Sequence, residues 1–216
     1  MVRTEKAVFG EFAFTAEEQQ LYTEGVDAIT AGTARALATT YDFARHHKVL
    51  DLGGGSGSFL LAVLRQHPHI EVTLFDLPTV GALARQRLAG SPVAARLRIV
   101  EGDFFTDPLP AAHDVMLIAN VFHNFLPERN RTLLERVGAG AAAGTRLLLV
   151  DFWTDPTHTQ PLMAALMAGA FLLVTGEGDV YSAEEVRNWL QATGWRMLKC
   201  KPLAGPTSLI EAEKAA

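Results

Sequence analysis

Several features are scarce or missing in this sequence, and each absence narrows what the protein can be. The one cysteine, Cys200, excludes an internal disulfide and fits a reducing compartment. No dense cluster of lysine and arginine occurs, and the formal net charge is −5, which argues against nucleic acid as the main partner. The longest uncharged apolar run, Leu162 to Val174, is too short to span a bilayer, and the N-terminal residues lack the apolar core of a secretory signal. The sequence therefore predicts a soluble, cytoplasmic protein that does not bind a membrane.

Familiar catalytic motifs are also absent. There is no G-x-S-x-G nucleophile elbow, no H-E-x-x-H metal motif and no Walker G-x-x-x-x-G-K-[ST] sequence. The histidines show no metal-ligand spacing, so no metal site is predicted. None of the three tyrosines has a lysine four residues later, so the Tyr/Lys pair of a short-chain dehydrogenase active site is missing.

What is present is the pattern of an α/β protein. The chain has 216 residues, 49% of them hydrophobic, which is enough for one globular domain with a real core. Apolar runs with strand character alternate with helical segments, and two β-like runs with only a turn between them close the sequence. This predicts a doubly wound, mostly parallel sheet with an antiparallel last strand. The strands are expected at 49–52, 72–76, 96–100, 115–119 and 147–151, and the antiparallel pair at 195–203 and 208–212.

The first 40 residues are expected to be a helical lead-in to a domain that covers residues 41–216. Leu21, Val26, Ile29 and Leu37 recur at roughly helical spacing, which predicts one or two helices over 16–40. Further helices are expected at 57–66, 78–88, 127–137, 162–174 and 182–194.

A glycine-rich turn follows the first expected strand. Asp51 lies in that strand, and glycines follow at positions 53, 55 and 57, directly before an apolar helix. A strand, a tight turn and a helix N-terminus in this order let backbone approach a nucleotide-like ligand. Ser58 stands where the dinucleotide fingerprint has its third glycine, but Asp76 closes the next strand where a ribose-binding acid is expected.

Ionisable residues lie at, or shortly after, the carboxyl ends of the expected strands. They are Asp51, Asp76, Asp103, His123 and Asp151. In an open α/β sheet these ends converge on the edge where ligands bind. Each acid alone is as easily a turn or cap residue, and a lone histidine is often a core residue, but five at one edge favour a site. Because the strands before His123 and Asp151 are expected to be neighbours, the acid should hold the histidine in one tautomer and make it a better base.

The apolar helix expected at 162–174 carries a possible substrate surface. Met163, Met167, Phe171 and Thr175 recur every four residues along one slowly drifting stripe. Together with Phe122, this stripe is a candidate wall for a flat apolar substrate, since methionine adapts to irregular shapes. Plain core packing explains the same periodicity.

The motifs together resemble a known family, the S-adenosylmethionine-dependent small-molecule O-methyltransferases of the caffeate and hydroxyindole type. The resemblance runs from about Phe12 to the C-terminus and implies a Rossmann-like class I methyltransferase fold. It rests on residues 49–57, on Phe75-Asp76-Leu77-Pro78, on Gly102-Asp103-Phe104-Phe105, on Asn120-Val121-Phe122-His123-Asn124-Phe125 and on 208–214.

The resemblance also implies roles for individual residues. The glycine turn with Asp51, Gly53, Gly55 and Gly57 would lie against the methionine part of the cofactor. Asp76 would bind the ribose hydroxyls, and Leu77, Asp103 and Phe104 would surround the adenine. His123 matches the general base of the family, and Asp151 matches an acid that orients it.

The chain departs from the family pattern in three places. The usual His-Asp-Trp reads His123-Asn124-Phe125, and Val180 appears where a second acid flanks the base, with Glu177 and Asp179 nearby. Family members also carry a helical N-terminal domain that dimerises and helps to close the substrate pocket. We therefore expect a homodimer or a separate helical subunit as the partner.

The leading hypothesis is methyl transfer from S-adenosylmethionine to a phenolic hydroxyl of a small natural product. A noncatalytic or partner-dependent S-adenosylmethionine-binding subunit is the second hypothesis. An NAD-dependent oxidoreductase is the third, and the missing fingerprint glycine and Tyr/Lys pair count against it.

Overall fold

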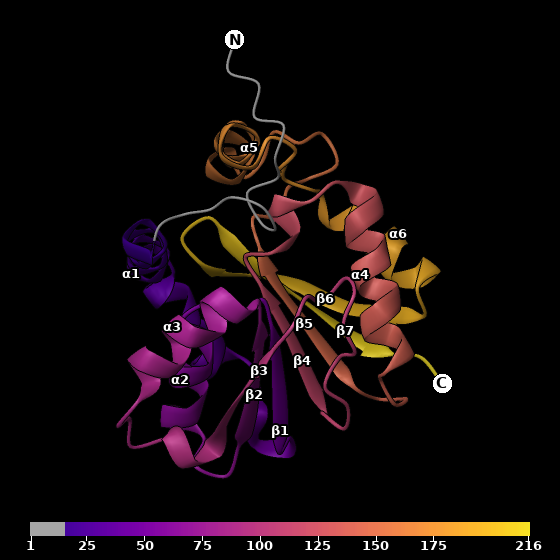
Figure 1. Cartoon of the computed structure of the whole chain (residues 1–216). Helices are drawn as coiled ribbons and strands as arrows, with labels where there is room; N and C mark the ends of the chain where they lie inside the picture. Colours follow the sequence, from indigo (N-terminus) through magenta and orange to yellow (C-terminus); the bar gives the residue numbers. More distant parts are fainter. Residues whose placement is uncertain (1–15) are drawn as a thin grey trace.

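One twisted sheet organises the computed structural model, which describes residues 16–216 (Figure 1). Within those residues the sheet has seven strands in the order β3-β2-β1-β4-β5-β7-β6. They are β1 (Lys48–Leu52), β2 (Glu71–Asp76), β3 (Leu97–Glu101), β4 (Val115–Ala119), β5 (Arg146–Asp151), β6 (Trp195–Ala204) and β7 (Thr207–Lys214). The first five pair in parallel, and β7 runs antiparallel to both β5 and β6. The predicted doubly wound sheet with its antiparallel end is confirmed.

Helices cover both faces of this sheet. Figure 1 shows α1, α2 and α3 on one side and α4 and α6 on the other, with α5 apart from both layers. Their bounds are α1 (Ala16–Thr40), α2 (Ser58–Gln66), α3 (Pro78–Leu88), α4 (Pro127–Ala139), α5 (Leu162–Thr175) and α6 (Ala183–Ala192). The first 15 residues of the predicted lead-in lie outside the described residues. Among the described helices, none is both long and apolar enough to cross a membrane.

The alternation of side chains along the central strands creates the two halves of the core. All five residues of β4 are buried, as expected for a strand with helices on both faces. Leu117 and Leu148 point to the side of α1 to α3, whereas Met116 and Leu147 point to the side of α4 and α6. Because successive side chains of a strand alternate, one apolar run serves both layers.

The direction of winding reverses between β1 and β4. β1 pairs with β2 on one side and with β4 on the other, and the chain reaches β4 only after building β2 and β3. The connections that leave the carboxyl ends of β1 and β4 therefore run to opposite sides and leave a crevice between them. This crevice lies where the sequence predicts the ligand.

Helix α1 is joined to the C-terminal hairpin. The hydroxyl of Thr33 in α1 is hydrogen-bonded to that of Thr207, the first residue of β7, at 3.1 Å. Both side chains are buried, and α1 also packs against α2 and β6. The β6–β7 hairpin thus helps to hold α1 against the rest of the domain.

Arg96, directly before β3, secures the far end of α2. Its guanidinium donates hydrogen bonds to the carbonyl oxygens of Leu64 (2.8 Å), Ile70 (2.9 Å) and His67 (3.0 Å). These carbonyls lie at the C-terminal end of the helix and in the turn after it, where intrahelical donors are lacking.

Replacing Arg96 by methionine keeps most of the aliphatic stem but removes these bonds. Since hydrogen bonds to a charged group are worth more than neutral ones, Arg96→Met should lower the free energy of unfolding by about 1.5–3 kcal/mol. Urea unfolding followed by circular dichroism measures this. Arg98→Met, at an exposed position of β3, is the matched control, and equal losses in the two variants would contradict the assignment.

Candidate active site between β1 and β4

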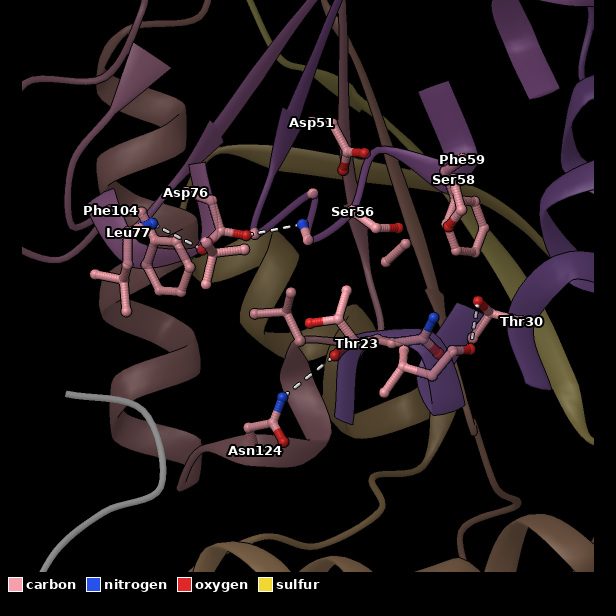
Figure 2. Close-up of a pocket in the computed structure, with 18 of the residues that line it drawn as sticks. Thr23, Thr30, Asp51, Ser56, Ser58, Phe59, Asp76, Leu77, Phe104 and Asn124 are labelled. Carbon is pink, nitrogen blue, oxygen red and sulfur yellow. Dashed lines mark hydrogen bonds between the residues drawn. The ribbon is translucent and has the colours of Figure 1, made fainter. Parts of the chain in front are cut away.

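A cavity occupies the crevice at the carboxyl ends of β1 and β4. Figure 2 shows Asp51, Asp76 and Phe104 around the same space as Thr23 and Thr30 of α1. Of the predicted cofactor residues, seven line this cavity: Asp51, Gly53, Gly55, Asp76, Leu77, Asp103 and Phe104. Gly57 does not line it, but lies at the N-terminus of α2, against Leu74 and Leu88.

The glycine turn brings backbone to the edge of the cavity. Gly53 and Gly55 have φ values of +72° and +56°, in the left-handed region that side chains disfavour. A Cβ at Gly53 would lie only 2.9 Å from Val121, so the turn also needs glycine for space. At Gly55, a Cβ would meet nothing within 4 Å, because this residue faces the open cavity.

Asp76 anchors that turn to the end of β2. Its carboxylate accepts hydrogen bonds from the backbone N–H of Gly55 at 2.8 Å and of Leu77 at 2.7 Å (Figure 2). Burial raises the pKa of Asp76 to about 6, although these two bonds act in the opposite direction. Each carboxylate oxygen keeps a further lone pair for a ligand.

Asp51 is a buried acid without a protein partner. The residue is 1% exposed, and within the described residues neither carboxylate oxygen has a hydrogen-bond partner. Burial, with a smaller contribution from the negative charge of Asp76, raises the pKa of Asp51 to about 8. A buried polar group without a partner is costly, so this residue favours a ligand with a positive charge.

Helix α1 supplies the opposite wall, which sequence reasoning missed. Thr23, Val26, Asp27 and Thr30 line the cavity and fall on one helical face. Asp27 accepts a hydrogen bond from Ser56 in the glycine turn and forms an ion pair with Arg87 of α3. The i, i+3, i+4, i+7 spacing of these residues was the available signal.

His123 and Asp151 contact each other, as predicted, but neither lines the cavity, whose wall includes Val121 and Asn124 on either side of the histidine. His123 lies in a short 3₁₀ turn, Phe122–Asn124, directly after β4, and its Nδ1 is 2.7 Å from Asp151 Oδ1. The same oxygen accepts the backbone N–H of Phe152 at 2.9 Å, so the carboxylate is fixed. Nδ1–H donates to Asp151 in this arrangement, which leaves the lone pair on Nε2 of the neutral ring. Both residues are buried.

Three further residues hold the turn that carries His123. The amide of the fully buried Asn130 donates to the carbonyl oxygens of Phe122 at 2.9 Å and Phe125 at 3.0 Å. The Tyr181 hydroxyl also donates to Phe125 O, and Asp179 N–H donates to His123 O at 3.1 Å. His123 therefore lies on a turn that hydrogen bonds hold in place.

The five predicted substrate-pocket residues do not line the cavity. Phe122 is fully buried in the core against Trp153 and Trp189, and Met163 is 59% exposed. The other three lie on the inner side of α5, namely Met167, Phe171 and Thr175. The Thr175 hydroxyl bonds to the carbonyl of Phe171 at 3.0 Å.

No second acid reaches the ring of His123 in the described part of the chain. Val180, which stands where the resemblance places a second acid, is buried in an apolar cluster with Phe152 and Ala164. Glu177 pairs instead with Arg129 at 3.3 Å, and the Asp179 carboxylate accepts the N–H of Val180 at 2.7 Å. Asp151 alone is hydrogen-bonded to the imidazole among residues 16–216.

Comparison with known proteins agrees with this geometry. The sequence matches the O-methyltransferase domain family over residues 4–196. The chain belongs to this family. The O-methyltransferase family predicted from the motifs is therefore confirmed.

Similar proteins include a 3-hydroxy-5-methyl-1-naphthoate 3-O-methyltransferase of Streptomyces sahachiroi. It is 34% identical over 183 residues, which are 85% of this chain and 53% of that protein. The chain thus spans about half the length of this relative.

Solved structures show the same fold. Human N-acetylserotonin methyltransferase, in complex with SAM, matches with a TM-score of 0.86 and 26% identity over 94% of this chain and 57% of its own. PigF, with SAH, matches with a TM-score of 0.84 and 27% identity over 93% of this chain and 60% of its own. The predicted class I methyltransferase fold is confirmed.

The unpaired acid in the cavity predicts how stability depends on pH in the ligand-free protein. The ordinary pKa of Asp51 is 3.8, and in the folded protein it is about 8, so between these values the folded state binds more protons than the unfolded one. The free energy of unfolding should therefore fall as pH rises from about 4 to about 8 and then level off. Chemical unfolding at a series of pH values measures the slope.

Asp51→Asn has no proton to gain at this position, so its stability should fall less over the same range. Asp76 still contributes below about pH 6 in this variant. Parallel curves for the wild type and Asp51→Asn would show that Asp51 is not the titrating group.

Proposed function

We propose that this chain transfers a methyl group from S-adenosylmethionine to a phenolic hydroxyl of a small natural product, with His123 as general base. The observation that carries the proposal is the His123–Asp151 pair, with Nδ1 held by the acid and Nε2 left without a protein hydrogen bond among the described residues. Enzymes of this family are S-adenosylmethionine-dependent O-methyltransferases, and S-adenosylmethionine is the cofactor that the family indicates.

The cavity fits that cofactor residue by residue. Asp51 would offer its unpaired carboxylate to the positively charged methionine part, which relieves the cost of a lone buried charge. Asp76 would accept hydrogen bonds from the ribose hydroxyls with its remaining lone pairs. Leu77, Asp103 and Phe104 would surround the adenine, with apolar side chains against the flat ring.

The chemistry follows from the position of the base. A phenol has an ordinary pKa near 10, so at neutral pH its hydroxyl is a poor nucleophile. As the hydroxyl oxygen attacks the methyl carbon, Nε2 of His123 takes the phenolic proton. The new C–O bond forms while the C–S bond breaks, and the bonding pair stays on sulfur, giving S-adenosylhomocysteine and a methyl ether. Asp151 keeps the ring oriented and balances the positive charge that forms on it.

The acceptor is proposed to be flat and aromatic. Two of the three similar proteins above are named for a hydroxynaphthoate and for N-acetylserotonin. Around His123 this chain presents the aromatic rings of Phe152 and Phe171, with Met167 in the same apolar cluster. Such walls suit an apolar ring better than a charged or highly polar one.

Loss of the base should separate binding from chemistry. His123→Ala is expected to bind S-adenosylmethionine as the wild type does, but to form S-adenosylhomocysteine roughly 10²- to 10⁴-fold more slowly. Calorimetry and a coupled assay with hydroxynaphthoates and hydroxyindoles measure the two quantities. His47→Ala is the control, because that side chain is 76% exposed.

The alternatives give different results in the same experiment. Cofactor binding without turnover of any acceptor by the wild type would favour a subunit that needs a partner. Binding of NADH in place of S-adenosylmethionine would overturn the proposal in favour of an oxidoreductase. Unchanged turnover in His123→Ala would remove the general-base role alone.

We also propose that a second copy of the chain, or a separate helical segment, covers α5. Six apolar residues on this helix are more than half exposed, and Leu173 is 87% exposed. They are Leu162, Met163, Leu166, Leu172, Leu173 and Val174. Exposed apolar groups of this extent mark interaction surfaces.

Light scattering tests which partner covers α5. A homodimer of the 23.4 kDa chain should dissociate to monomer when Leu166 and Leu173 are both replaced by glutamine. The paired control, Leu21→Gln with Ile29→Gln, removes equally exposed apolar residues from α1 and should leave the mass unchanged. A wild-type monomer would favour the separate helical segment, and a dimer insensitive to the α5 changes would place the interface elsewhere.

We also propose that residues 1–40 are a helical lead-in and that residues 41–216 form the S-adenosylmethionine-binding domain. The support for this division is that α1 precedes the alternation of strands and helices that begins with β1. Thr23 and Thr30 nevertheless line the cavity, so the lead-in would serve the site of the domain that follows.

A further inference from the structure

Phe171 lies flat on the ring of His123. The two ring centroids are 3.7 Å apart and the planes differ by only 11°. Phe171 comes from α5, which packs against the turn that carries the histidine. Phe152 meets the same imidazole at 5.9 Å and 69°, in an edge contact. The histidine therefore has Asp151 at Nδ1 and a phenylalanine against one face.

This geometry is a poor one for two uncharged rings. Neutral aromatic pairs prefer offset or edge-to-face arrangements with centroids about 4.5–7 Å apart, because their faces both carry negative charge. The contacts Phe152–His123 and Phe152–Phe171, at 5.9 Å and 5.3 Å, follow this rule. The His123–Phe171 stack does not.

A positive charge on one ring changes the sign of the interaction. The face of a phenylalanine attracts a cation within about 6 Å of its centre, and more strongly where water is excluded. His123 is 8% exposed, so its surroundings are largely dry. The stack is thus matched to imidazolium, the form that exists after His123 has accepted a proton.

The other groups around His123 offer little further stabilisation to a protonated ring. Val180 places an apolar side chain where a second acid would otherwise lie, and among the described residues only Asp151 is hydrogen-bonded to the ring. One carboxylate at the ring edge and one aromatic face are therefore the groups that this structure supplies to a charged imidazole.

We propose that Phe171 is a positioning residue for the base, whose ring face holds the His123 imidazole and stabilises it once it is protonated. The inference rests on the proposed function, in which Nε2 takes the proton of the acceptor hydroxyl while the methyl group moves from sulfur to oxygen. The proton later passes from Nε2 to solvent, and the stack returns to its neutral form. Phe171 thus acts on the transition state through His123, in addition to any contact with the acceptor.

The test compares Phe171→Leu with Phe171→Tyr. Leucine keeps an apolar side chain of similar reach but has no aromatic face, so kcat should fall roughly two- to thirty-fold. Tyrosine keeps the face and should retain kcat within about twofold of the wild type. The Kd for S-adenosylmethionine should change little in both variants, because Phe171 does not line the cavity that fits the cofactor.

A double-mutant cycle with His123→Ala isolates the coupling. If Phe171 acts through the base, Phe171→Leu should cost nothing further once His123 is absent. The same loss in both backgrounds, or a rise in KM with kcat unchanged, would show that Phe171 is only a wall for the acceptor and would overturn the inference. Melting temperatures confirm that the variants are folded.

NMR provides a readout that does not need the acceptor. A phenylalanine face at 3.7 Å should move the His123 Hε1 resonance upfield, and Phe171→Leu should remove that displacement while Phe171→Tyr keeps it. Absence of the displacement in the wild type would overturn the inference. If the wild type and His123→Ala are equally inactive, the proposed function itself has failed. If the wild type is active and His123→Ala is not, but Phe171→Leu turns over as fast as the wild type does, this inference alone has failed.

Discussion

The parallel pairing of β4 with both β1 and β5 is the constraint on which the rest of the structure depends. One partner strand ends in the glycine turn, and the other ends in Asp151. His123 follows β4 itself, between the two. A five-residue strand with every side chain buried therefore fixes the distance between the cavity beside the glycine turn and the His123–Asp151 pair. Neither place has to be built from long flexible loops, which is what a reaction with strict alignment requires.

Much of this arrangement could be predicted from the sequence, because its causes are local. Fully apolar runs that end in an acid, with glycine or proline at the turns, identify strand ends and helix starts, and the His123–Asp151 contact follows from strand order. α1 is different. Its spacing of Leu21 and Ile29 indicates a helix, yet both are largely exposed, at 71% and 79%. The face that α1 turns inward is held by Asp27, whose partners Ser56 and Arg87 are distant in sequence.

The stripe on α5 shows a second limit of sequence reasoning. That helix is apolar all round, so periodicity cannot say which side is buried. In the structure Met163 faces outward while Phe171 lies on His123, although the two belong to the same predicted stripe. Phe122 belongs to the core for a related reason, since a residue next to His123 can point away from it in a 3₁₀ turn. Contacts between distant elements decide such cases.

The contact between α1 and β7 has a consequence for how the protein is made. Thr33 is synthesised 174 residues before its partner Thr207. β5 likewise remains an edge strand until β7 is available to pair with it. The central strands and their helices can assemble while translation continues, as domains do. The residues that hold the cavity face of α1, Ser56 and Arg87, precede that hairpin, so the wall of the cavity has its nearer supports before β7 adds the last one.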